Sequence, residues 1–306
     1  LVMGAGPIGC ELAQAFSRLG SHVTLVDMAS QIMPREDTEV AAHVEQVFRA
    51  AGIEVLTRHR AVGFRKEAGR DIAEFDCDGE TRSLEFDRVL VAVGRRANSE
   101  GLGLEELGIE TRADGTIVVD DFLRTSVPTV LACGDIAGPY QFTHMASHQA
   151  WYTAVNALFG FARKFRVDYS VVPWTTFTDP EVARVGLNEL EAKERGVDYE
   201  ATRYDIDDLD RAIADGEAHG FIKVLTEPGK DRILGVTIVG YHAAELLAEY
   251  VLAMKHGIGL NKILGTIHVY PTLSEANKFV AGEWRKARKP ERLLNWLEKF
   301  HGWRRG

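Results

Sequence analysis

Three glycines near the start of the sequence have a spacing suited to holding a phosphate group. Gly4, Gly6 and Gly9 form a Gly-x-Gly-x-x-Gly pattern between a short apolar run and a segment with helical periodicity. In such a turn the first glycine permits a tight bend, the second lets the backbone approach a pyrophosphate, and the third lets helix and strand pack closely. The free N–H groups and the positive dipole end of the following helix favour an anion.

An acidic residue lies where the sugar of a nucleotide would be recognised. A second apolar run, residues 22–26, ends in Asp27, eighteen residues after Gly9. A carboxylate at this distance hydrogen-bonds a ribose 2′-hydroxyl and repels a 2′-phosphate. Strand, glycine turn, helix, second strand and acid together predict a dinucleotide-binding βαβ unit that prefers NADH to NADPH.

The elements that position these residues alternate along the first third of the chain. Apolar spacing predicts a helix over residues 8–19 that stops at Gly20, and a second helix over residues 37–51. Residues 53–56 predict the next parallel strand. A turn at Asp78–Gly79 indicates an antiparallel meander, whose strands we expect at residues 61–64, 72–77 and 81–86. The largely apolar run 88–93 predicts a strand buried on both faces, which ends at Gly94.

A shift in composition around residues 165–169 marks a domain boundary. Beyond it we expect strands at residues 174–185, 199–206, 220–226 and 233–239, and helices at residues 188–195, 243–256 and 290–300. Helices segregated onto an antiparallel sheet are typical of an α+β domain. The predicted fold is an α/β Rossmann-like domain with an antiparallel meander over residues 1–120, a segment over 121–166 with a helix at residues 143–160, an α+β domain over 167–290 and a basic tail over 291–306.

Composition excludes several classes of protein. The 306 residues, with 45% hydrophobic and 26% charged, suffice for two globular domains, and the net charge of −9 argues against nucleic acid as a partner. No apolar run approaches the length of a transmembrane helix. The three cysteines, Cys10, Cys77 and Cys133, are far apart, which predicts neither a disulfide framework nor a metal site and favours a reducing, cytoplasmic compartment. We interpret Cys10 as a packed side chain.

Five segments in this order resemble the pyridine nucleotide-disulfide oxidoreductases, the flavoenzyme family of dihydrolipoamide dehydrogenase and mercuric reductase. The glycine turn, with Pro7, Ile8 and Glu11, is similar to the family's NAD(P)-binding fingerprint. Four further segments resemble its "ATGRxPN" strand end, its Gly-Asp motif, the opening of its dimerisation domain and its C-terminal active-site loop; they are residues 91–98, 125–135, 177–187 and 271–275.

The resemblance implies an enzyme that passes hydride from NADH to FAD and on to a disulfide, metal ion or other acceptor. It implies that residues 121–166 are a returning part of the FAD-binding domain, in which Asp135 contacts the ribityl chain. Further cofactor contacts are implied for Glu11, Val93, Gly94, Gly134, Thr143 and Ala146. A homodimer formed through residues from about 168 onward is implied as well.

The C-terminal loop departs from the family's pattern. In the disulfide reductases a histidine precedes the Pro-Thr pair and forms an acid–base dyad with a glutamate; here Glu275 is in place, but Tyr270 occupies the histidine's position. A tyrosine, with a reference pKa near 10, is a poor base at neutral pH but a capable hydrogen-bond donor. Mercuric reductases similarly carry a tyrosine, yet they end in a cysteine pair that this sequence lacks. His268 is an alternative base, although two extended residues separate side chains by roughly 6.5 Å.

Two parts of the family pattern do not occur in the sequence: the first, FAD-binding βαβ unit and the redox-active Cys-x4-Cys pair. The opening strand also begins only three residues before Gly4. We therefore expect the chain to be the C-terminal two-thirds of a longer enzyme, inactive by itself. The alternative is a non-catalytic nucleotide-binding or dimeric assembly module, which the loss of the histidine and of paired cysteines favours.

The end of the chain is basic within an acidic protein. Residues 283–306 hold eight Lys or Arg and three Glu, a local charge of +5. We interpret this segment as a solvated helix with basic residues at its end. Contact with an acidic partner surface or an anionic membrane is the alternative.

Overall fold

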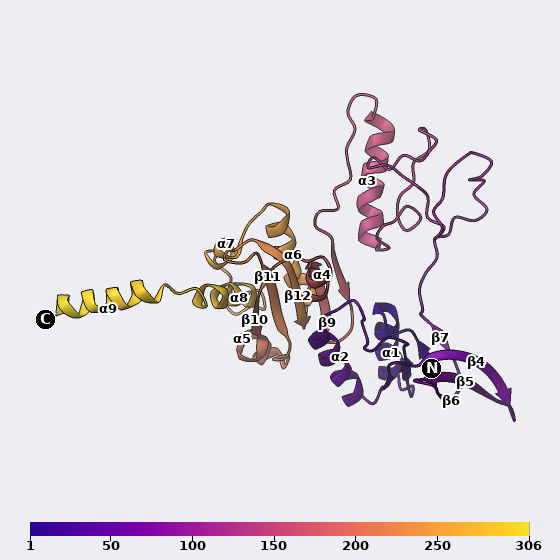
Figure 1. The fold of residues 1–306 in the computed structure, drawn as a ribbon, viewed down its shortest axis with the longest axis horizontal. Helices are drawn as coiled ribbons and strands as arrows, with labels where there is room; N and C mark the ends of the chain where they lie inside the picture. The colour runs from indigo at the N-terminus through magenta and orange to yellow at the C-terminus, as the bar shows by residue number, and fades with distance from the viewer. Residues whose placement is uncertain (306) are drawn as a thin grey trace. The chain divides into compact units, whose positions relative to one another are not determined.

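The computed structural model describes residues 1–305, apart from the side chains of residues 291–293. The chain forms two units: Leu1–Val93 joined by the chain from Val171 onward, and Gly94–Ser170. Figure 1 shows the elements of both, coloured along the sequence.

Four short parallel strands surround the glycine turn. β1 (Val2–Met3), β2 (Thr24–Val26), β3 (Glu54–Leu56) and β7 (Leu90–Val91) pair in the order β3-β2-β1-β7. The connections are the two predicted helices, α1 (Pro7–Arg18) and α2 (Thr38–Ala50). Proline opens α1 because its fixed φ suits a first helical turn, and Gly20 follows the helix with a φ of +97°. An open parallel sheet presents binding residues at the carboxyl ends of its strands, which is where the glycine turn lies.

The glycine turn and α1 approach each other more closely than any side chain would allow. A Cβ built on Gly9 would lie 1.7 Å from the Gly4 carbonyl oxygen, and one built on Gly4 would lie 2.5 Å from the Ala92 carbonyl oxygen. Gly4 also has a φ of +98°, which L-residues with side chains rarely adopt. Both positions therefore require glycine for packing, as the spacing predicts.

The expectation of a strand buried on both faces over residues 88–93 is wrong. β7 has only two residues, and Val89, Val91 and Val93 are 39%, 60% and 70% exposed. Leu90, which points to the other face, packs against the core of the sheet. Alternate side chains of a strand point to opposite faces, so an apolar run does not by itself show that both faces are covered.

The predicted meander is confirmed. β4 (Arg60–Glu67), β5 (Arg70–Cys77) and β6 (Glu80–Phe86) form an antiparallel sheet in the order β4-β5-β6. Asp78 and Gly79, both at positive φ, make the turn between β5 and β6. Phe75 of β5 is fully buried in a small cluster with Val26 of β2, so this hairpin structure is anchored to the parallel sheet.

A five-stranded antiparallel sheet forms the rest of the larger unit. Its strands are β8 (Pro173–Thr176), β9 (Glu181–Gly186), β10 (Glu200–Asp205), β11 (Phe221–Thr226) and β12 (Ile233–Gly240), in the order β10-β11-β12-β9-β8. The single strand predicted over residues 174–185 is wrong, because residues 177–180 turn the chain from β8 back into β9. The α+β character of this part is confirmed.

Helices cover this sheet or flank it. Tyr250 of α6 (Ala243–Lys255) and Trp284 of α8 (Glu275–Lys286) are buried in its core. α8 is not among the helices that the sequence predicts. The other elements are α4 (Glu189–Glu194), a 3-10 turn η1 (Ile206–Asp208), α5 (Asp210–Asp215), α7 (Leu260–Leu264) and α9 (Glu291–Arg305). In the part of the chain that the structure describes, no helix has the length and apolarity needed to cross a membrane.

Two buried cations join the N-terminal loop of α2 to the five-stranded sheet. Arg184 of β9, 1% exposed, contacts Glu36 at 3.0 Å and Glu191 at 2.9 Å, and its guanidinium lies 4.2 Å from the ring centroid of Trp174. Lys223 of β11, 4% exposed, contacts Glu189 at 2.9 Å and two carboxylates from the start of α2, Asp37 and Glu39. These pairs connect positions up to 186 residues apart in sequence (223 against 37).

Burial affects the acids and the base of these pairs differently. It raises the pKa of the Glu36 carboxyl, because the attraction of Arg184 offsets only part of the lost hydration. It lowers the pKa of Lys223, but the hydrogen bonds to three carboxylates outweigh this effect and bring the pKa above its usual value. Lys223 is therefore charged whenever the protein is folded at neutral pH.

The smaller unit is built around α3 (Thr143–Phe159), which the sequence predicts over residues 143–160. Its core contains Ile109, Ile117, Ala132 and Ala137. Buried amides organise the loops: Asn156 bonds the backbone of Phe122 and of Phe165. Two isolated bridges, Thr111 to Ile117 and Arg124 to Leu131, replace longer strands.

Replacing Gly9 by alanine tests how closely α1 lies against the glycine turn. Because the added carbon would overlap the Gly4 carbonyl, either the turn or the helix must move. We expect Gly9→Ala to lower the free energy of unfolding by about 3 kcal/mol, as overpacked sites do. Urea unfolding followed by far-UV circular dichroism measures this.

Gly6→Ala is the matched control, since a Cβ at Gly6 has no atom within 4 Å. Its expected cost is below about 1 kcal/mol. Equal urea midpoints for the two variants would contradict the close packing of α1.

Candidate functional site

The glycine turn leaves an exposed stretch of backbone at the start of α1. Gly6 is the residue before the helix, and the space where its side chain would lie is open to 4 Å. No side chain caps the N-terminus of α1, so the first N–H groups of the helix are available to a ligand. Pro7 and Ile8 form the first turn beside this opening, and Ile8 is exposed. The arrangement can hold an anionic group by backbone donors and the helix dipole.

Asp27 lies at the carboxyl end of β2 and holds the glycine turn in place. Its Oδ2 accepts the Ala5 N–H at 2.6 Å, and its Oδ1 accepts the Ala29 N–H at 2.7 Å. The residue is still partly exposed, and each carboxylate oxygen can accept a further hydrogen bond. The sequence pattern predicts Asp27 as a ribose ligand, and the structure adds that the same carboxylate orders the turn.

Cys10, next in the helix, has no reactive character. Its Sγ lies 3.3 Å from the Ala5 carbonyl oxygen and the residue is fully buried. Burial raises the pKa of the Cys10 thiol to about 12, so desolvation outweighs the helix N-terminus, which would lower it. The thiol is a packed side chain, as the sequence analysis interpreted it.

Glu11 and its neighbour one turn on connect α1 to the five-stranded sheet. Glu11 Oε1 accepts the Phe177 N–H at 2.8 Å. Gln14 bonds both backbone groups of Asp179, its Nε2 donating to the carbonyl oxygen at 2.7 Å and its Oε1 accepting the N–H at 2.8 Å. Arg18 forms an ion pair with the Asp179 carboxylate. Glu11 therefore fixes the turn between β8 and β9, and Val93 lies near Gly4 at the end of the neighbouring strand.

The smaller unit brings together the residues that the resemblance assigns to FAD. Gly134 has a φ of +80°, and a Cβ there would lie 3.3 Å from the Cβ of Ala146 on α3. Its N–H donates to Gln149 Oε1 at 2.6 Å. Asp135, half-exposed, lies 3.7 Å from Arg95 Nη1, next to Gly94. Thr143 begins α3, whose N-terminus also has no side-chain cap. Open donors and one exposed acid suit a phosphate and a polyol chain.

The C-terminal loop does not form the expected dyad. Tyr270 donates its hydroxyl to Asp210 Oδ2 at 2.9 Å and does not bond Glu275. This hydrogen bond, with the negative charge of Asp210, raises the pKa of Tyr270. Glu275 begins α8 and accepts the Thr272 N–H at 3.2 Å, closing the loop on itself. Both residues border a cavity of about 520 Å³, together with Tyr204, Asp208, Lys278 and Phe279.

His268 lies elsewhere and has its own partners. Its side chain is 7% exposed, and its Nε2 lies 3.1 Å from both carboxylate oxygens of Glu249 on α6. Its Nδ1 lies 3.2 Å from the Thr266 carbonyl oxygen. Asn277 of α8 donates to Glu249 at 2.8 Å. His268 is thus not placed to replace the missing histidine beside Glu275; it ties the loop to α6.

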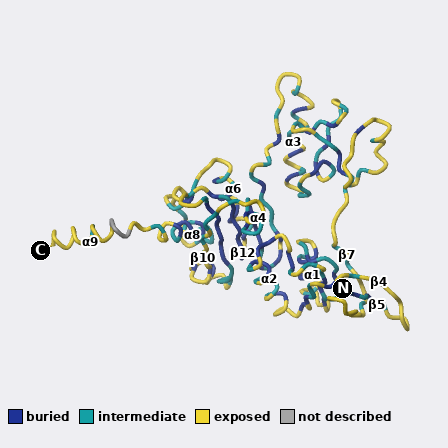
Figure 2. The backbone as a smooth tube through the Cα atoms, in the orientation of Figure 1, coloured by how far each residue is buried: buried dark blue, intermediate teal, exposed yellow. Residues whose placement is uncertain are grey.

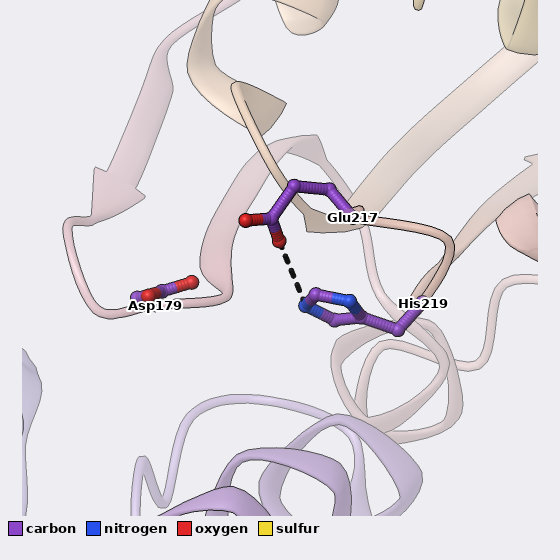
Figure 3. A group of neighbouring side chains, drawn as sticks. All are labelled: Asp179, Glu217 and His219. Atoms are coloured by element: carbon purple, nitrogen blue, oxygen red, sulfur yellow. Dashed lines mark ion pairs between the residues drawn. The ribbon is translucent and has the colours of Figure 1, made fainter. Parts of the chain in front are cut away.

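Two groups of side chains have their oxygen and nitrogen atoms within 4.8 Å of one another, as metal ligands do. Asp37, Glu39 and Glu189 surround Lys223, whose ammonium fills the site. Figure 3 shows the other group, Asp179, Glu217 and His219, where His219 Nε2 lies 3.5 Å from Glu217 Oε2. Asp179 is also paired with Arg18, so a cation there would compete with a guanidinium. We assign no metal to either group.

The comparisons with known proteins follow the same segments. Residues 1–150 match the family model "Pyridine nucleotide-disulphide oxidoreductase", and residues 172–280 match the dimerisation domain of that family. Dihydrolipoyl dehydrogenase of Thermus scotoductus is 38% identical over 277 residues, covering 90% of this chain and 59% of that protein. Mercuric reductase of Streptomyces lividans is 33% identical over 281 residues, covering 92% of this chain and 59% of that protein.

Solved structures agree with these relatives. The HOCl-induced flavoprotein disulfide reductase RclA from Escherichia coli superposes with a TM-score of 0.83 at 26% identity, covering 92% of this chain and 63% of the reductase. LpdA from Mycobacterium tuberculosis gives a TM-score of 0.82 at 28% identity, covering 92% of this chain and 60% of LpdA. The chain thus spans about three-fifths of the relatives it matches. The two matched segments, the relatives and the fold agree, and the chain belongs to the pyridine nucleotide-disulphide oxidoreductase family.

Proposed function

We propose that this chain is the nicotinamide-nucleotide-binding and interface portion of an FAD-dependent oxidoreductase that accepts hydride from NADH. The observation that carries the proposal is the open backbone at Gly6, at the uncapped start of α1, with the Asp27 carboxylate beyond it. A pyrophosphate fits such an opening, and a half-exposed carboxylate fits a ribose diol. The names of the relatives support the reaction class.

The residues have separate roles in this proposal. Backbone groups from Gly4 to Gly9, with Pro7 and Ile8, hold the dinucleotide phosphates, Asp27 binds the adenosine ribose, and Glu11 and Val93 border the nicotinamide. Gly94, Gly134, Asp135, Thr143 and Ala146 hold FAD, which supplies a two-electron acceptor when bound. We keep the predicted domain limits: residues 1–120 for NAD, 121–166 for part of the FAD site, 167–290 for dimerisation and 291–306 for the tail.

In this proposal the C-terminal loop contacts the electron acceptor. The hydrogen bonds of the loop limit which reactions its side chains can assist. Tyr270, hydrogen-bonded to Asp210, presents a neutral phenol, so we propose that it positions an acceptor by hydrogen bonding and does not remove a proton. Glu275 shapes the loop, and His268 holds it to α6. A homodimer formed through residues from about 168 onward would bring this loop to the partner subunit. The cytoplasm remains the proposed location.

A non-catalytic nucleotide-binding module is the second candidate. The absence of an acid–base dyad among Tyr270, Glu275 and His268 favours it, because both potential partners of Glu275 are bonded to other carboxylates. It shares the nucleotide site of the first proposal and differs only in the later electron transfer.

Gly6→Ala tests the nucleotide site. The methyl group would enter the space proposed for the pyrophosphate without touching the protein. We expect NADH to bind at least about tenfold more weakly, since a charge-assisted hydrogen bond contributes about 1.5–3 kcal/mol. Isothermal titration calorimetry measures the affinity.

Gly282→Ala, on α8 and far from the turn, is the control and should bind NADH as the parent chain does, because the nearest atom to its Cβ is 3.9 Å away. Unchanged binding by Gly6→Ala would place the dinucleotide elsewhere.

The choice between NADH and NADPH depends on Asp27. Its negative charge attracts a ribose hydroxyl and repels a 2′-phosphate, so NADH should bind roughly tenfold more tightly than NADPH, a difference of about 1.4 kcal/mol. Titrating the unmodified chain with each dinucleotide at low salt measures the ratio. Equal or tighter binding of NADPH would show that Asp27 serves only to order the turn.

The isolated 306-residue chain should not oxidise NADH. Its sequence contains neither the family's FAD adenine-binding motif nor a Cys-x4-Cys pair. We expect the purified chain to show no flavin absorption band and no NADH consumption with a dye acceptor. A bound flavin together with NADH oxidation would refute this expectation.

A further inference from the structure

The C-terminal helix α9 presents an apolar side that the described chain does not cover. Trp296, Phe300 and Trp303 recur at i, i+4 and i+7 and therefore share one side of the helix. Trp296 and Trp303 are 58% and 78% exposed, unlike Tyr250 and Trp284, which are buried. The recorded ring contacts of all three stay within α9, with Trp296 and Phe300 stacked 5.5 Å apart. Figure 2 shows most of the described length of α9 as exposed, and Leu297 alone among its described side chains is partly buried.

The opposite side of α9 is mainly polar, with Leu294 as an apolar member, and its flanks are basic. Asn295, Glu298 and Arg305 lie on that side at helical spacing. Lys299 lies between the two sides. The guanidinium of Arg304 lies 6.0 Å from the ring centroid of Phe300, so a charged group borders the aromatic side. Among the described residues of α9, no side chain forms an ion pair with another element.

Charge separates this segment from the rest of the chain. Residues 283–306 carry +5 within a net charge of −9, which leaves −14 for residues 1–282. A negative surface therefore repels the rest of the chain on balance and attracts this end. The match to the family's dimerisation domain ends at residue 280, so α9 lies outside the segment that would form the family's interface.

We propose that α9 lies on the surface of an anionic lipid bilayer. Its aromatic side would enter the boundary between headgroups and acyl chains, and its basic side chains would contact lipid phosphates. Helices with Trp and Phe on one side and Lys and Arg on the other bind in this way. With fifteen residues it is too short to cross the bilayer.

Arg304 favours lipid over a protein groove as the occupant. A groove that buried Phe300 would take the adjacent guanidinium out of water, which is costly without a partner carboxylate. At a bilayer the long side chain can reach the phosphate layer while its methylenes stay beside the aromatic ring. The two tryptophans suit the same boundary, because an indole has an apolar body and one polar N–H.

Co-sedimentation of the full chain with vesicles tests the proposal. We expect binding to vesicles of equal parts phosphatidylglycerol and phosphatidylcholine, at least about tenfold weaker binding to phosphatidylcholine alone, and weakening by salt. Tryptophan fluorescence should shift to shorter wavelength on binding. No binding to anionic vesicles would overturn the proposal.

Matched variants locate the contact. Phe300→Ala/Trp303→Ala should lose at least about tenfold in vesicle affinity, whereas Asn295→Ala on the polar side should keep it. Lys299→Glu/Arg305→Glu leaves the aromatic side intact and should also lose binding. A chain ending at residue 289 lacks α9 and should not bind the vesicles. This truncation tests the proposal even if one of the substituted variants is misfolded.

Sedimentation velocity without lipid provides the opposing outcome. If removal of residues 290–306 changes the oligomeric state, α9 contacts a second copy of the chain and the lipid proposal is wrong. The proposal is also wrong if Phe300→Ala/Trp303→Ala binds vesicles as the unmodified chain does, because α9 then contacts another surface. Neither result affects the nucleotide site, so this proposal and the proposed function can fail independently.

Discussion

The structure of the larger unit depends on neutralising two buried cations. Arg184 and Lys223 point from the five-stranded sheet into the loop that begins α2, where carboxylates from both parts of the chain surround them. An unpaired cation buried at either position would be strongly unfavourable. Separating the two sheets would therefore cost free energy, because it would leave these charges without their partners. The loop before α2 follows directly from β2 and Asp27. The electrostatic pairing thereby fixes the glycine turn relative to the sheet that carries the C-terminal loop.

A second set of contacts holds α1 to the five-stranded sheet. Glu11 and Gln14 bond the backbone of the turn between β8 and β9, while Gly9, in the first turn of α1, packs against the Gly4 carbonyl. The helix whose N-terminus faces the proposed pyrophosphate is thus held at both sides. A binding site made of backbone N–H groups requires this, because its donors cannot adjust by changing rotamer.

Local patterns in the sequence were sufficient for the parallel sheet and its first helices. The glycine spacing, the proline at the start of α1 and Gly20 at its end each act within a few residues, and the structure places them as expected. The errors arise where burial depends on distant parts of the chain. Residues 89–93 are apolar, but whether a face of their strand is buried depends on the elements that pack against it, which the sequence of the strand does not show. The turn in residues 177–180 contains Asp179–Pro180, a local turn signal that the single predicted strand overlooked. α8 packs against α7, β10 and β11, elements that precede it in the chain.

The same distinction between local patterns and contacts with distant parts of the chain applies to the candidate site. The grouping of the three glycines with Asp27 could be inferred, because Gly4, Gly6, Gly9 and Asp27 are close in sequence. The second role of Asp27, which is to hold the turn through the Ala5 N–H, could not be inferred from the sequence. The partners of the C-terminal loop could not be inferred, because Tyr270 bonds Asp210, sixty residues earlier, and His268 bonds Glu249, nineteen residues earlier.

The exchange of histidine for tyrosine changes more than one side chain. A histidine that pairs with a carboxylate can take up and release a proton near neutral pH. Tyr270 has the opposite behaviour, because Asp210 stabilises its neutral form and raises its pKa, and the hydroxyl proton is already directed to that carboxylate. The oxygen of Tyr270 can still accept a hydrogen bond or contact a positively charged group. Under the proposed function, the loop is therefore better suited to holding an acceptor with a proton or positive charge of its own than to protonating a thiolate.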